Sequence, residues 1–269
     1  MKIKPTPATI WKRPAYLPYV QPPLTDELVR QAETQFGHPL PPLFLDILRV
    51  QNGGPIRFSV PDSVGRVIAG IGPSYPSITD YDLCDHQEYV DYSLEGLVPF
   101  DGDGHWYHCL DYRYNSEEPA VSYIDVECNS QNRIADSFSD FLQLMELKLD
   151  NELVLQNVCD FDDAQRQLLA IFGSKFEHEI SNIGVPNATL KTGTKWNECF
   201  WISPNKVAES YSGDDPRSFE FKGDALLFPE LSPATVIFEA TSQYIGSYRM
   251  RLLEAGLALV DVHTAANAT

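Results

Sequence analysis

The chain has 269 residues and carries 20 Lys and Arg against 38 Asp and Glu, which gives a formal net charge of −18 at pH 7. This excess of acids argues against binding to nucleic acid or to an anionic membrane surface, because both need clustered cations. The length allows one large hydrophobic core or two smaller ones.

The apolar residues and the cysteines favour a protein of a reducing compartment. No run of about 18 apolar residues occurs, so we expect no membrane span, and the N-terminus lacks the apolar core of a secretory signal. The cysteines are few, scattered and odd in number, which fits neither a disulfide framework nor CxxC metal clips. We therefore expect a cytoplasmic protein. The cysteines are Cys84, Cys109, Cys128, Cys159 and Cys199.

The N-terminal segment is rich in proline and aromatic residues. Proline lacks the backbone N–H and disfavours a helix before it, so residues 1–21 are predicted to form an extended arm. We expect this arm to lie on the body of the protein through Trp11, Tyr16, Leu17 and Tyr19.

Two helices are predicted next, within a domain that we place at residues 22–149. Thr25 is a suitable N-cap for the first helix, and Gly37 ends it. Pro41 and Pro42 begin the second helix, which the Asn52-Gly53-Gly54 turn stops. The residues expected to face the core are Leu28, Ala32, Phe36, Leu43, Phe44, Ile47 and Leu48.

A short hairpin is predicted over residues 56–72, followed by a polar stretch whose middle, residues 78–92, is either a short helix or a loop. Alternation then predicts strands over residues 105–112 and 120–127, joined by a polar turn at residues 115–119. If these strands pair, we expect Tyr107 and Tyr123 on one face, beside the three carboxylates Asp111, Asp125 and Glu127. Carboxylates are rarely buried unpaired, so that face is predicted to be wet.

A third helix is predicted to begin at Asp136 or Ser137, because Ser137 followed by Asp140 resembles a capping box. Phe138, Phe141 and Met145 then fall at helical spacing and form an apolar stripe that faces the core.

Acidic residues gather in the middle of the chain. From residue 80 to residue 127, thirteen acids stand against one base, Arg113. Such a patch either keeps the protein soluble or speeds association with a basic partner. The acids are Asp80, Asp82, Asp85, Glu88, Asp91, Glu95, Asp101, Asp103, Asp111, Glu117, Glu118, Asp125 and Glu127.

Several short motifs in a consistent order resemble the SUKH superfamily, which is related to the yeast cell-wall regulators of the Smi/Knr type. The resemblance covers about residues 22–147, a little under half of the chain. It lies in the helix that ends in an Asn-Gly-Gly turn, the Asp-Gly hairpin and the run into the third helix. The matching residues are Leu40-Pro41, Asn52-Gly53-Gly54, Asp101-Gly102-Asp103-Gly104, Leu110-Asp111, Pro119-Ala120-Val121, Asp125, Glu127 and Ile134-Ala135-Asp136-Ser137-Phe138.

This resemblance implies an α+β fold, in which a mixed or antiparallel sheet is flanked by helices. It also implies a role: many bacterial members look like immunity proteins that bind and neutralise a toxin. Members are not generally enzymes, so the resemblance implies no catalytic residues. We also expect no cofactor and no metal, since His105 and His108 would point to opposite faces of a strand. The implied partner is a cognate protein toxin, and many such toxins are nucleases, which tend to be basic.

We therefore predict a non-catalytic binding module with an acidic face. Its carboxylates would pair with the cations of the toxin, and two tyrosines would anchor the contact, because tyrosine supplies rigid area and a hydroxyl. The predicted partner-binding residues are Asp101, Asp103, Tyr107, Asp111, Tyr123, Asp125 and Glu127.

Two other functions remain open. A hydrolase could use Asp111, Asp125 and Glu127 if they converge across the hairpin, since paired carboxylates serve glycoside hydrolysis. A regulatory scaffold would follow the yeast relatives. A calcium loop at residues 101–112 is disfavoured, because His105, Trp106 and Tyr112 stand where an EF-hand needs Asp or Asn, Gly and Glu.

Residues 150–269 match no family that we recognise and are predicted to form a second α+β unit, either a separate domain or an extension of the first sheet. We expect helices over residues 162–180 and 244–255. The predicted strands are residues 196–202, 219–221, 225–228, 236–240 and 257–262, and residues 263–269 are expected to fray.

Overall fold

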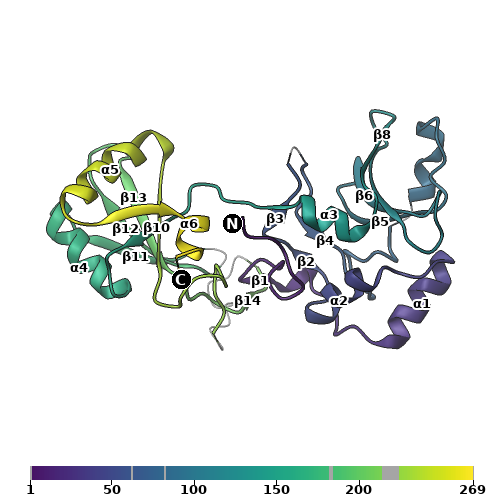
Figure 1. Cartoon of the computed structure of the whole chain (residues 1–269), viewed down its shortest axis with the longest axis horizontal. Coiled ribbons are helices and arrows are strands. Elements are labelled where there is room, and N and C mark those ends of the chain that lie inside the picture. The colour runs from purple at the N-terminus through teal and green to yellow at the C-terminus, as the bar shows by residue number, and fades with distance from the viewer. Residues whose placement is uncertain (1, 62, 82, 182–183, 214–223, 269) are drawn as a thin grey trace. The chain divides into compact units, whose positions relative to one another are not determined.

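The computed structural model describes residues 2–61, 63–81, 83–181, 184–213 and 224–268. The chain divides into two compact units, Ile3–Lys148 and Leu149–Thr269, the latter with Met1–Lys2 (Figure 1). Each unit combines helices with antiparallel sheet, so the predicted α+β class is confirmed.

The first unit opens with short elements and two helices. Thr25 caps α1 by accepting a hydrogen bond from the Leu28 amide, and Gly37 ends the helix in the left-handed conformation, both as predicted. Of the predicted arm, Trp11 is buried while Leu17 is exposed. The elements are β1 Ala15–Tyr16, the 3-10 helix η1 Leu17–Tyr19, α1 Asp26–Phe36, α2 Pro42–Val50, β2 Gly54–Pro55, β3 Phe58–Ser59, β4 Val67–Ile68 and the 3-10 helix η2 Leu83–Tyr89.

The segment predicted as one hairpin over residues 56–72 is less regular than expected. The two-residue strands β2 and β4 pair with each other, whereas β3 pairs with β9 (Glu146–Leu147). Asn52 holds this region together from the helix end, because its side chain donates to the Pro22 and Ile71 carbonyls and accepts from the Ile71 amide.

A four-stranded antiparallel sheet, in the order β5-β6-β7-β8, is the main sheet of this unit. Ser137 caps α3, as predicted, by accepting from the Asp140 amide. Phe44 of α2, Phe100 of β5 and Phe138 of α3 meet edge to face in the core beside the sheet. The elements are β5 Leu97–Gly102, β6 Trp106–Asp111, β7 Ala120–Asp125, β8 Ser130–Ala135 and α3 Phe138–Leu144.

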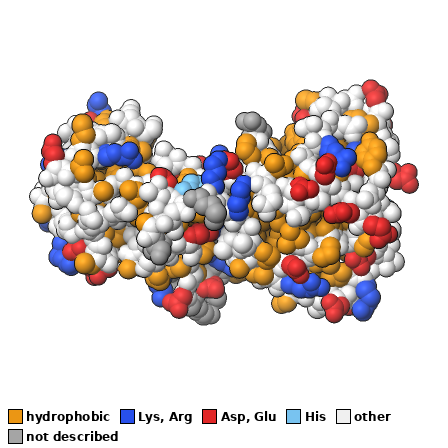
Figure 2. Space-filling model, viewed as in Figure 1, with side chains coloured by type: hydrophobic (Ala, Val, Ile, Leu, Met, Phe, Trp, Pro, Cys, Tyr) orange, Lys and Arg blue, Asp and Glu red, His pale blue; other side chains and the backbone are white. Residues whose placement is uncertain are grey.

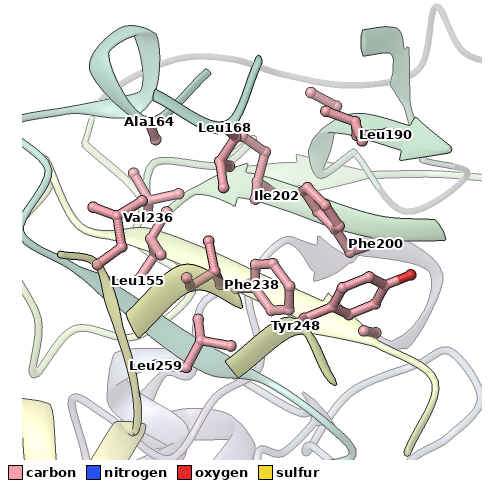
Figure 3. Close-up of a cluster of buried hydrophobic side chains, with 14 residues drawn as sticks. Leu155, Ala164, Leu168, Leu190, Phe200, Ile202, Val236, Phe238, Tyr248 and Leu259 are labelled. Atoms are coloured by element: carbon pink, nitrogen blue, oxygen red, sulfur yellow. The ribbon is translucent and has the colours of Figure 1, made fainter. Parts of the chain in front are cut away.

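The second unit is built on a six-stranded antiparallel sheet, in the order β11-β12-β13-β15-β10-β16. One face of this sheet and the helices α4 and α5 enclose a core that includes Phe200, Phe238 and Tyr248 (Figure 3). The elements are β10 Leu153–Gln156, α4 Phe161–Phe172, β11 Phe176–Ile180, β12 Pro186–Lys191, β13 Cys199–Pro204, β14 Ser210–Tyr211, β15 Val236–Ala240, α5 Ser242–Glu254, β16 Ala258–Asp261 and α6 Val262–Ala266.

Several predictions for this unit are wrong. The helix expected to reach residue 180 ends at Phe172, because Gly173 takes the left-handed conformation and donates to the Leu169 carbonyl. The tail expected to fray forms α6, whose first turn Asp261 caps. Residues 225–228 form only an isolated bridge, and the strand expected at residues 219–221 lies outside the described residues.

Candidate partner-binding site

The pairing of β6 with β7 corrects the predicted acidic face. Tyr107 pairs with Ile124, and His108 pairs with Tyr123, so Tyr107 and Tyr123 lie on opposite faces of the sheet. The prediction that Tyr107, Asp111, Tyr123 and Asp125 share one wet face is therefore wrong. The sequence shows the alternation within each strand, but the register between the strands decides which residues meet.

Tyr107 is a core residue rather than a surface anchor. It is 5% exposed and packs with Cys109 and Ile124 under the segment that carries η2. Its hydroxyl lies 3.2 Å from His86 Nε2, so it ties η2 to the sheet.

Asp111 is buried in an ion pair. It is 1% exposed, and its carboxylate accepts hydrogen bonds from Arg113 Nε at 2.9 Å, Arg113 Nη2 at 2.7 Å and Ser122 Oγ at 2.7 Å. Burial acts to raise the pKa of Asp111, but the Arg113 guanidinium and the Ser122 hydroxyl lower it below its usual value. Asp111 therefore stabilises the fold and is not available to a partner.

Asp101 is also buried, with 5% of its surface exposed. Its carboxylate accepts from the Gly102 amide at 3.0 Å and the Val67 amide at 3.5 Å, and it faces His108 Nδ1 at 3.5 Å. The prediction of a wet acidic face is wrong for Asp101 as well, because neighbouring amides and an imidazole replace the water.

Three of the predicted carboxylates do gather at one end of the sheet. The β5–β6 turn carries Asp103, and the β7–β8 turn follows Asp125 and carries Glu127. The Val126 amide donates to the His105 carbonyl at 2.9 Å, and His105 Nδ1 lies 3.5 Å from Glu127 Oε2, so the two turns adjoin. We call Asp103, Asp125 and Glu127 the acidic end.

Backbone amides fix two of these carboxylates. Asp103 Oδ1 accepts from the His105 amide at 2.9 Å and the Trp106 amide at 3.3 Å, and Asp125 Oδ1 accepts from the Cys128 amide at 2.7 Å. Burial acts to raise the pKa of Asp103, but hydrogen bonds from His105 and Trp106 lower it. Both carboxylates are thus held in place before any partner arrives, and the Asp103 amide donates to the Trp106 carbonyl at 3.2 Å across the turn.

An aromatic pair adjoins the acidic end. Trp106 and Tyr123 stack with ring centroids 6.0 Å apart and an interplanar angle of 16°, and both are half-buried. Burial and the charges of Asp125 and Asp103 raise the pKa of Tyr123, so its hydroxyl remains a donor. Trp106 was not predicted from the sequence as a binding residue. Its position directly after the Asp103 turn could have indicated that it lies beside that carboxylate.

More acids surround this end on η2 and the loop after it. Asp91 exchanges hydrogen bonds with Asn129 of the β7–β8 turn, which brings the loop close to the acidic end. Asp85 and Glu88 are exposed on η2, and Asp82 lies outside the described residues. Figure 2 shows acidic side chains spread over the visible face of the Ile3–Lys148 unit, with hydrophobic side chains between them.

The single base of the stretch from residue 80 to residue 127 does not neutralise these acids. Arg113 is engaged with Asp111, and within the described residues no Lys or Arg forms an ion pair with Asp103, Asp125 or Glu127. The acidic end therefore keeps its charge for an external cation.

The strand register does not support a hydrolase that uses Asp111, Asp125 and Glu127 together. Asp111 pairs with Ala120 at one end of the hairpin, whereas Asp125 pairs with Trp106 at the other end. The three carboxylates therefore do not converge. In the described part of the chain, no group of three His, Cys, Asp or Glu is placed to hold a metal ion, and no helix is long and apolar enough to cross a membrane.

A comparison with protein families supports the resemblance. Residues 23–144 match the model of the SMI1 / KNR4 family (SUKH-1), which agrees with the resemblance found in the motifs. No curated protein matches the chain. The matched residues lie within the Ile3–Lys148 unit and include the acidic end.

Proposed function

We propose, from the premise that residues 23–144 are a domain of the SMI1 / KNR4 family (SUKH-1), that this protein is an immunity protein that binds and neutralises a cognate toxin. The toxin would be a basic protein, and a nuclease is the class that we expect. Binding through the acidic end would cover the toxin's cations and occlude its active cleft.

One observation carries this proposal. Three carboxylates lie on or beside two adjoining turns, without a Lys or Arg partner among the described residues, next to the stacked Trp106 and Tyr123. Fixed, unneutralised charge favours fast association with a surface of opposite sign. A rigid aromatic pair beside it provides the contact area that dominates many interfaces.

The partner is to be identified by pull-down of the tagged full chain from its native cell at low salt, with elution in salt steps. We expect a basic polypeptide that elutes as the salt rises, because exposed charge pairs are screened. The polypeptide should kill cells when expressed alone and spare them when this protein is expressed with it. A partner that is harmless to the cell would favour the regulatory scaffold instead.

Removing charge from the acidic end is expected to slow association. In the double variant Asp103→Asn/Glu127→Gln, we expect the on-rate for the toxin to fall about tenfold at low salt, since steering contributes mainly to the on-rate. Surface plasmon resonance at two salt concentrations measures it, and the difference from the unmodified protein should shrink at high salt.

The matched control is Glu117→Gln/Glu118→Gln, which removes the same charge from exposed positions in the turn between β6 and β7. That turn lies at the opposite end of the sheet, so we expect a change of less than about twofold. Equal losses in the two double variants would show that net charge alone matters, and the role assigned to the acidic end would then be wrong.

A further inference from the structure

A buried histidine on the sheet face that carries Tyr123 lies between a serine and an aspartate. His108 is 2% exposed, its Nε2 lies 3.0 Å from Ser63 Oγ, and its Nδ1 lies 3.5 Å from Asp101 Oδ2. We propose that Ser63, His108 and Asp101 form a nucleophile, base and orienting acid, and that this chain hydrolyses small esters. This activity would be additional to the proposed toxin binding, and the two sites share Trp106 and Tyr123.

The two ring nitrogens of His108 face the two groups that acyl transfer requires: Nε2 faces the Ser63 hydroxyl, and Nδ1 faces the Asp101 carboxyl group. With the proton on Nδ1, facing Asp101, the Nε2 lone pair accepts the hydroxyl proton of Ser63. Asp101 is held by the Gly102 and Val67 amides, so its carboxyl group stays directed at the ring. The ring is in contact with the aromatic residues Phe100, Trp106, Tyr123 and Phe141, which hold its orientation.

The loop that carries Ser63 is packed against the histidine and the aspartate. A Cβ at Gly65 would lie 2.4 Å from both Asp101 Oδ2 and His108 Cε1, so the close approach of this backbone requires glycine. The Ser63 amide donates to the Val60 carbonyl at 3.1 Å. The Gly65 amide lies 3.4 Å from Ser63 Oγ, and we assign it as a donor to the oxyanion.

Ser63 and His108 line a pocket of about 470 Å³. This volume suits a small ligand, and most of the wall is apolar. We therefore assign the substrate class as carboxylic esters with a short aliphatic acyl group. The apolar side chains of the wall are Val60, Pro61, Val64, Ile134 and Leu144.

The chemistry needs no group beyond the substrate and water. Ser63 Oγ bonds to the ester carbonyl carbon while its proton passes to His108 Nε2. Collapse of the tetrahedral oxyanion breaks the bond to the leaving oxygen, which takes the proton from Nε2. Water then attacks the acyl-serine by the same route, which releases the acid and restores the Ser63 hydroxyl.

The test is covalent labelling of the full chain with a fluorophosphonate probe, followed by peptide mass mapping, and turnover of p-nitrophenyl acetate and butyrate. We expect one label, on Ser63. Ser63→Ala should abolish the label and lower kcat/KM at least about 100-fold. Ser139→Ala, which alters an exposed serine of α3, should change neither result.

Asp101 is a positioning residue, and its test separates kcat from KM. Asp101→Asn should lower kcat at least about 100-fold and leave KM within about twofold, because the substrate pocket remains. Circular dichroism checks that each variant folds. If a variant does not fold, labelling of the unmodified chain still shows whether Ser63 reacts with the probe. Absence of a label on Ser63, or turnover that persists in Ser63→Ala, would overturn the proposal.

Discussion

Replacing Asp111 by asparagine is expected to destabilise the Ile3–Lys148 unit by about 3 to 5 kcal/mol. The Asp111 side chain is 1% exposed and that of Arg113 only 13%, so the variant leaves a guanidinium largely out of water without its counter-charge. It also removes the acceptor of the Ser122 hydroxyl. Urea unfolding with hydrogen exchange of peptides from each unit measures the loss and shows whether peptides of the second unit stay unchanged.

The matched control is Asp80→Asn, the same substitution at an exposed position, for which we expect less than about 0.5 kcal/mol. The free energy of unfolding of Asp111→Asn should also fall less on acidification than that of the unmodified protein. Because the pKa of Asp111 is lowered in the folded state, its contribution is present above its usual 3.8 and is lost as the pH falls below that value. If Asp111→Asn instead folded normally but bound the partner slowly, Asp111 would have the interface role that the sequence predicted for it.

Local signals were sufficient for much of the first unit. The caps at Thr25 and Ser137 and the helix end at Gly37 depend on hydrogen bonds within a few residues, which sequence spacing records directly. The hairpin of β6 and β7 is likewise predicted by alternating side chains in each strand and a polar turn between them. Family motifs then supplied the α+β class, and the match over residues 23–144 supports it.

The predicted helix over residues 162–180 shows where such signals conflict. Phe172, Phe176 and Ile180 are four residues apart, which is helical spacing, yet Phe176–Ile180 is strand β11, and Phe176 pairs with Leu190 of β12. Gly173 was the available sign of a helix end, and the partner strand β12 was not recognised in the sequence. Pairing with the next strand along the chain therefore overrode the helical spacing.

The predicted exposure of two site residues, Asp101 and Asp111, was wrong for a related reason. Whether Asp101 and Asp111 lie in water depends on His108 and Arg113 being placed to pair with them, and on the register that assigns each strand residue to a face. Asp103 and Glu127 sit in turns, where exposure follows from the turn itself. The sequence therefore identified Asp103 and Glu127 of the turns and Asp125 at the end of β7, and it misassigned Asp101 and Asp111 of the strands.

The second unit contains an acid that should make its stability depend on pH. Glu239 of β15 is half-buried, and burial together with the nearby charges of Glu152 and Asp150 raises its pKa from the usual 4.5 to about 7. The folded state thus binds the proton more tightly than the unfolded state. Stability from this group is fully present below pH 4.5 and is lost as the pH rises towards 7.

We expect Glu239→Gln to stabilise the second unit by about 3 kcal/mol at pH 8, because glutamine has the charge of the protonated acid and the gap between 4.5 and about 7 corresponds to that energy. The advantage should vanish by pH 4.5. Hydrogen exchange of peptides from residues 149–268 at several pH values measures it.

The control for Glu239→Gln is Glu152→Gln, which removes one of the two charges that raise the pKa of Glu239. It should recover only part of the stability at pH 8, since burial is the larger cause of the shift. If instead Glu239→Gln gave the same gain at every pH, the benefit would come from packing. An ionised, well-solvated Glu239 would give no gain at all, and either result would contradict the raised pKa.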